Sequence, residues 1–102
     1  MNCGLGDNTI NRIKAVFRRF PEISRVMLYG SRAKGNYKPG SDIDLTFFGN
    51  GLDLKSLSRI DGALDELDLP YLFDLSLYDE IENPDFLDHI KRVGILFYDS
   101  GK

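Results

Sequence analysis

Two aspartates, Asp42 and Asp44, stand two positions apart in the segment SDIDLTFF (41–48), in which polar and apolar residues alternate. Such alternation is typical of a β-strand, where residues i and i+2 point to the same face. The two Cα atoms would lie roughly 6.5–7 Å apart, so both carboxylates can lean onto one hard cation. Mg²⁺ suits this arrangement because it takes one or two carboxylates and completes its shell with water and substrate phosphates. The pair therefore indicates a candidate magnesium site, and the simpler alternative is that both carboxylates only decorate a solvent-facing strand.

A third carboxylate, Asp74, lies between Phe73 and Leu75 in a second predicted strand, YLFDLSL (71–77). A carboxylate has little reason to stand in the middle of an apolar strand unless its face of the sheet is functional. If this strand neighbours the one that carries Asp42 and Asp44, all three carboxylates form one acidic patch. Asp74 would then be a general base toward an attacking hydroxyl, or a ligand of a second metal ion.

The dipeptide Gly30-Ser31 ends another predicted strand, SRVMLY (24–29). The strand leads through a tight turn into one or two helical turns, so that several backbone N–H groups point at one place and favour an anion. Gly30 lets a phosphate approach the backbone closely, the Ser31 hydroxyl can donate to it, and Arg32 and Lys38 can pair with its charge. The simpler alternative is that Gly30 only makes a turn and Ser31 only caps a helix.

Composition and charge exclude several classes of protein. The 102 residues fit one domain (1–102), and the net charge of −3 argues against general binding to nucleic acids. One cysteine excludes an intrachain disulfide and a cysteine-based zinc site, and one histidine, His89, excludes a histidine-rich metal centre. His89 itself is expected at a helix surface or core edge. No membrane-spanning run or signal-peptide pattern is present, so we expect a soluble, cytoplasmic protein.

Charge is unevenly distributed along the chain. Residues 1–38 hold eight basic and two acidic residues, whereas the remainder holds five basic and fourteen acidic ones. A site that holds an anion beside a metal ion would show this polarity, and so would an ordinary dipolar surface.

Hydrophobic periodicity places these residues in an alternating order of helices and strands. The predicted helices cover 8–20, 31–34, 54–67 and 84–93, and the predicted strands cover 24–29, 41–48, 71–77 and 95–98. Helices between strands indicate a two-layer α/β (α+β) fold. We expect a mixed sheet of about four strands with helices packed on one face, and an open, acidic second face.

The segment LYGSRAKGNYKPGSDIDL, followed by FDLSLY, resembles the minimal nucleotidyltransferase (MNT) domain of the DNA polymerase β-like superfamily. The resemblance covers nearly the whole chain and implies the nucleotidyltransferase fold. It also implies that Gly30 and Ser31 lie at the triphosphate of ATP. Asp42, Asp44 and Asp74 would be the Mg²⁺-binding carboxylates.

The same resemblance suggests a partner. Larger relatives add a helical domain that holds the acceptor, for which this chain has no room, and stand-alone MNT proteins pair with a HEPN-domain protein. The chain would then be the antitoxin of a hetero-oligomeric toxin–antitoxin pair that transfers AMP from ATP to a tyrosine of the HEPN protein. Two alternatives stay open, namely a non-catalytic module that neutralises a helical partner by occlusion and a transferase that acts on a small, aminoglycoside-like acceptor.

Overall fold

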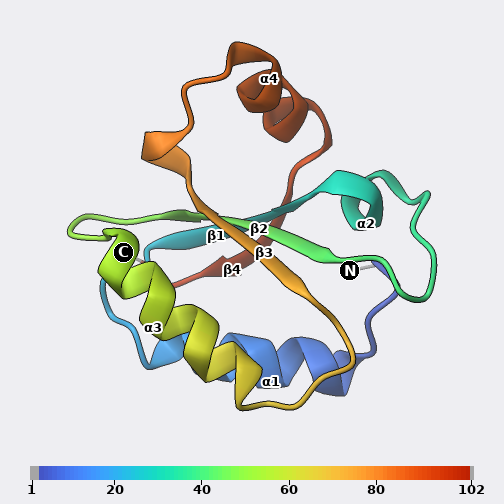
Figure 1. Cartoon of the computed structure of the whole chain (residues 1–102), viewed down its shortest axis with the longest axis horizontal. Helices are drawn as coiled ribbons and strands as arrows, with labels where there is room; N and C mark the ends of the chain where they lie inside the picture. The colour runs from blue at the N-terminus through green and yellow to red at the C-terminus, as the bar shows by residue number, and fades with distance from the viewer. Residues whose placement is uncertain (1–2, 102) are drawn as a thin grey trace.

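The computed structural model describes residues 3–101, and four strands and four helices follow one another along the chain (Figure 1). The elements are α1 (Asp7–Arg18), β1 (Arg25–Tyr29), α2 (Gly30–Lys34), β2 (Ile43–Phe48), α3 (Leu54–Asp65), β3 (Phe73–Leu77), a 3₁₀ turn η1 (Tyr78–Glu80), α4 (Pro84–Val93) and β4 (Ile95–Asp99). The predicted elements are all present. Within the described part of the chain, no helix is both long and apolar enough to cross a lipid bilayer.

The strands form one mixed sheet in the order β3-β2-β1-β4. β1 is antiparallel to both of its neighbours, whereas β2 and β3 are parallel and are connected through α3. Parallel neighbours need such a crossover because a tight hairpin cannot return the chain in the same direction. The prediction of a four-stranded mixed sheet is confirmed, and β2 and β3 are neighbours.

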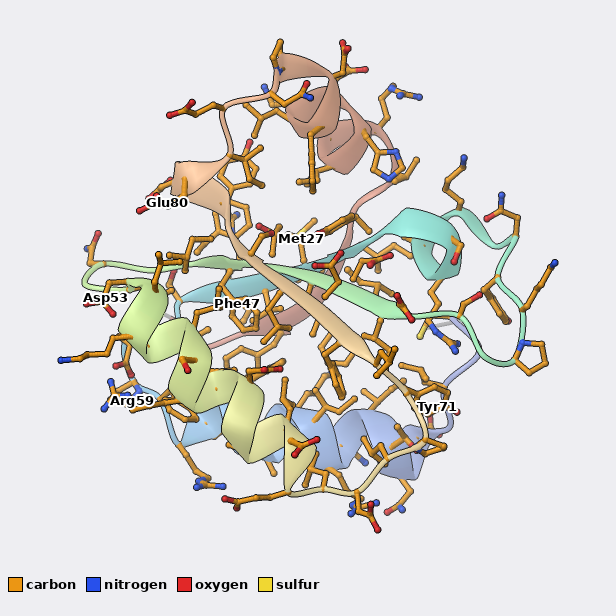
Figure 2. The ribbon with its side chains drawn as sticks, viewed as in Figure 1. Met27, Phe47, Asp53, Arg59, Tyr71 and Glu80 are labelled. Carbon is orange, nitrogen blue, oxygen red and sulfur yellow. The ribbon has the colours of Figure 1, made fainter. Side chains whose placement is uncertain are left out.

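One face of the sheet packs against α1 and α3, which lie side by side beneath it in Figure 1. The side chains of Val26, Leu28, Ile43 and Leu45 on this face are fully buried. Phe17 of α1 meets Phe47, which is labelled in Figure 2, edge-on with 5.4 Å between the ring centroids. The alternation of β2 therefore places its apolar residues in the core and leaves Asp44 on the opposite face.

The opposite face is not fully open, which corrects the expectation that the helices pack on one face only. α4 lies over it, and its Phe86 ring stands 5.3 Å from the Tyr29 ring of β1 (Figure 1). α4 continues through Gly94 directly into β4, which pairs with β1, so the helix comes to rest above β1. Thr46, on this second face of β2, is fully buried as well.

Candidate active site

Asp44 and Asp74 are direct neighbours in the sheet. The parallel register of β2 and β3 places the Asp44 Cα opposite the Asp74 Cα, and adjacent strands lie about 4.8 Å apart. Asp42 immediately precedes β2 and is exposed, and it lies near enough to Asp44 for its charge to raise the pKa of that carboxyl. The structure thus brings the three predicted carboxylates to one end of the face opposite α1 and α3.

The electrostatics of Asp44 show how closely these groups interact. The pKa of the Asp44 carboxyl is raised from 3.8 to about 6, first by burial and then by the negative charges of Asp74 and Asp42. The Arg32 guanidinium opposes this rise more weakly. A carboxylate held in its charged form at such a place needs a cation, since like charges and desolvation both favour protonation. A bound metal ion reverses that preference.

The turn at Gly30 faces the same carboxylate. Gly30 has φ +75°, a conformation that side chains rarely adopt, and a Cβ at this position would collide with the Asp44 carboxylate. The turn leads into α2, whose second residue is Ser31, and Gly35 ends the helix at φ +89°. Glycine is therefore required at position 30, because the backbone and the carboxylate approach each other too closely for any side chain.

His89 was not predicted as part of the site, but the structure places it there. The Gly30 N–H donates to Nε2 of His89 at 3.3 Å, and the His89 ring stands edge-on to Tyr29 with 6.2 Å between the centroids. A single histidine in an amphipathic helix gives no local signal of this contact. Only the packing of α4 over β1, which joins residues 59 positions apart, reveals it.

A pocket of about 370 Å³ lies between α4 and the sheet. Its lining residues are Tyr29, Gly30, Asp44, Asp74, Asp85, Phe86 and His89. A larger hollow of about 560 Å³ lies beside Arg25 and Phe48, but it contains none of the predicted site residues. The smaller pocket is therefore the candidate active site, because it unites Asp44 and Asp74 with the Gly30 turn, while Asp42 and Ser31 are not among its lining residues.

The structure corrects the prediction for Arg32. Its side chain is 1% exposed, and its guanidinium donates to the carbonyls of Cys3 (3.0 Å), Ser41 (2.9 Å) and Pro39 (3.3 Å). With its donors directed at the backbone, Arg32 holds the 37–41 loop and is not available to a nucleotide. Lys38 lies exposed in that loop, where its backbone N–H donates to the Ser41 hydroxyl at 2.8 Å, and its contact with a nucleotide stays a prediction.

The donor set fits Mg²⁺, which prefers oxygen ligands and needs few of them from protein. Among residues 3–101, no three acidic, histidine or cysteine side chains already stand together as a ligand cluster. The arrangement is therefore suited to an ion held by one or two carboxylates whose remaining ligands come from water and phosphate. A fully enclosed ion would need more ligands than this face supplies.

Comparisons with known proteins agree with this fold. Residues 11–102 match the family described as "Polymerase beta, Nucleotidyltransferase". A protein of Haemophilus influenzae named "Probable protein adenylyltransferase MntA" is 31% identical over 91 residues, which are 88% of this chain and 79% of that protein.

Two solved structures have a similar fold. A chain from "Crystal structure of the toxin-antitoxin with AMP-PNP" aligns with a TM-score of 0.71 at 21% identity, over 90% of this chain and 74% of its own length. A chain from the complex of a tri-AMPylated Shewanella oneidensis HEPN toxin with an MNT antitoxin aligns with a TM-score of 0.66 at 19% identity. The alignment covers 91% of this chain and 71% of that chain.

The family match and the curated relative together establish the class. The chain belongs to the polymerase β-type nucleotidyltransferase family.

Proposed function

We propose that this chain transfers AMP from ATP, with Mg²⁺, to a hydroxyl of a protein partner, and that the acceptor is a tyrosine of a HEPN-domain toxin. The observation that carries the proposal is the register of Asp44 against Asp74 beside the Gly30 turn. The relative named as a protein adenylyltransferase, and the similarity to chains of toxin–antitoxin complexes, support this choice of acceptor.

Five of the predicted residues receive a role in the proposed reaction, and Arg32 and Lys38 receive none. The backbone N–H groups that follow Gly30, together with the Ser31 hydroxyl, would hold the β- and γ-phosphates. Asp42 and Asp44 would hold Mg²⁺, which when bound neutralises phosphate charge and polarises the α-phosphate. Asp74 would accept the proton of the acceptor hydroxyl as its oxygen bonds to the α-phosphorus and pyrophosphate leaves. Positioning and charge stabilisation would supply most of the rate enhancement.

The proposal is tested by incubating the chain with a purified HEPN-domain partner, Mg²⁺ and ATP labelled at the α-phosphate. We expect label on the partner with the wild type and none with Asp42→Ala plus Asp44→Ala. The matched control removes two exposed carboxylates elsewhere, Asp7→Ala plus Glu66→Ala, and should transfer normally. Equal labelling by the wild type and the Asp42/Asp44 variant would exclude the proposed site. Neutralisation of the toxin by that variant, without labelling, would favour occlusion instead.

A further inference from the structure

β3 is an edge strand whose outer side is unpaired in the described part of the chain. The sheet order places β2 on one side of it and no strand on the other. The Ile43 N–H donates to the Leu72 carbonyl at 2.9 Å, so Leu72 directs its backbone groups toward β2. Because these directions alternate along a strand, Phe73 and Leu75 direct their N–H and C=O groups to the free edge. A free edge of this kind is a template for another strand.

Two hollows lie below this edge, between β3 and α3. One of about 240 Å³ is lined by Leu54, Leu57 and Leu75, and the next, of about 260 Å³, by Leu64, Leu69 and Tyr71. Phe73 and Asp61 line both hollows. Figure 1 shows β3 crossing in front of the sheet, with α3 directly beneath it.

Large apolar side chains are exposed along the same edge. Leu72, just before β3, is 74% exposed, and Leu54, the first residue of α3, is 70% exposed. Asp61, Asp65 and Asp68 line the hollows with them, so this surface combines apolar and acidic groups. A segment that fits it carries apolar side chains to cover the leucines and lysine or arginine to pair with the carboxylates.

We propose that an extended segment of the acceptor protein binds along β3 as an additional strand, with its hydroxyl residue opposite Asp74. Two apolar residues flank that hydroxyl residue, and lysine or arginine stands beyond them. This inference rests on the proposed function, since it assigns the acceptor of the same site.

The geometry follows from the alternation of side chains. A residue paired with Asp74 lies about 4.8 Å from it and points to the same face, into the pocket that holds Asp44. The residues before and after it point to the opposite face, where the two hollows stand beside Phe73 and Leu75. One binding mode therefore fills both hollows and presents the hydroxyl to the carboxylate that would accept its proton.

The binding arm of the test needs no catalysis. The probe is a fluorescein-labelled peptide, Lys-Lys-Val-Ile-Tyr-Val-Lys-Lys, titrated by anisotropy without ATP, and its control has Asp on both sides of the Tyr. We expect the first peptide to bind and to protect the Phe73 and Leu75 amides from hydrogen exchange, and the control not to bind. Leu54→Glu and Leu72→Glu should each weaken binding about tenfold or more, since each removes a leucine that the bound peptide would cover. Leu96→Glu is the matched control, because Leu96 is exposed (47%) on the other edge strand, and it should bind normally.

The transfer arm separates this inference from the proposed function. With Mg²⁺ and α-labelled ATP, the wild type should label the first peptide, and Leu54→Glu and Leu72→Glu should lose that labelling. If the HEPN partner is labelled at full rate by both leucine variants, strand addition is wrong while the transferase proposal stands. If the peptide binds and protects the amides but neither the peptide nor the HEPN partner is ever labelled, the transferase proposal fails while strand addition along β3 stands. Dimerisation of the chain that Leu72→Glu abolishes, without peptide binding, would identify the edge as a contact between copies and overturn the inference.

Discussion

Replacing Asp44 by asparagine should stabilise the metal-free protein at neutral pH, although it should also inactivate it. In the folded chain, burial and the charges of Asp74 and Asp42 raise the pKa of the Asp44 carboxyl from 3.8 to about 6. Above that pH the fold holds an unfavourable charge, and Asp44→Asn removes the charge with little change of shape. A site built only for stability would not hold such a group.

The sign and size of the effect follow from proton linkage. Below pH 3.8 both the folded and the unfolded chain keep the proton on Asp44. Between pH 3.8 and about 6 the unfolded chain releases the proton while the folded chain keeps it, so folding stability falls as pH rises through this window. A pKa rise from 3.8 to about 6 is equivalent to about 3 kcal/mol for a fully desolvated group. Because Asp44 is only partly buried, solvent screening reduces the expected gain to about 1 kcal/mol.

Urea unfolding of both proteins at pH 4 and pH 7.5, with EDTA and then with Mg²⁺, measures this difference. In EDTA at pH 7.5 we expect Asp44→Asn to have a higher free energy of unfolding than the wild type. At pH 4 this difference in free energy between the two proteins should be smaller. Mg²⁺ should stabilise the wild type, because an ion that binds only the folded state adds to its stability, and should leave Asp44→Asn nearly unchanged. The matched control Glu66→Gln, on the exposed end of α3, should differ by less than about 0.5 kcal/mol in each buffer. A variant that is less stable than the wild type at pH 7.5 in EDTA would refute the reasoning.

Three further predictions concern the surroundings of Asp44. Gly30→Ala should lower the free energy of unfolding by about 1–3 kcal/mol and abolish transfer, whereas Gly35→Ala, with open space at its Cβ, should cost about 1 kcal/mol and transfer normally. Arg32→Lys should lose about 2–3 kcal/mol in urea unfolding, because an ammonium cannot reproduce four guanidinium hydrogen bonds to three backbone carbonyls. His89→Ala should destabilise the fold by about 1 kcal/mol, since it leaves the Gly30 N–H without its acceptor, and His89→Gln should recover part of that loss.

Local patterns in the sequence were sufficient to predict the elements that carry the site. The helix expected over 84–93 forms with those bounds, because the Asn83 side chain accepts from the Asp85 N–H (2.9 Å) and Pro84 occupies the first helical position. The strands expected over 41–48 and 71–77 begin two residues later, at Ile43 and Phe73. Alternation reports which way side chains point and not where strand pairing begins, so the first residues of each run were assigned to the strand without being part of it.

What the sequence did not reveal depends on contacts between distant residues. The sequence shows that Arg32 is a basic residue but not whether its side chain is exposed or buried. Only the fold shows that its guanidinium donates to the Cys3 carbonyl, 29 positions away. The position of α4 over β1 likewise follows from the pairing of β4, which no local pattern fixes. For this reason an arginine near the predicted phosphate turn was assigned to the ligand, and a histidine that lines the pocket was expected only at a helix surface or core edge.

The pocket is acidic, and this charge bears on how a nucleotide triphosphate could bind there. The pocket is lined by Asp44, Asp74 and Asp85, and the nearby guanidinium of Arg32 is buried against backbone carbonyls. A triphosphate is itself strongly negative, so it would be repelled from these carboxylates unless cations came with it. Burial is the first cause of the raised pKa of Asp44, and the same kind of repulsion, from Asp74 and Asp42, adds to it. The charge balance of this pocket therefore supports the proposed use of a divalent metal ion, in the binding of the nucleotide as well as in the chemical step.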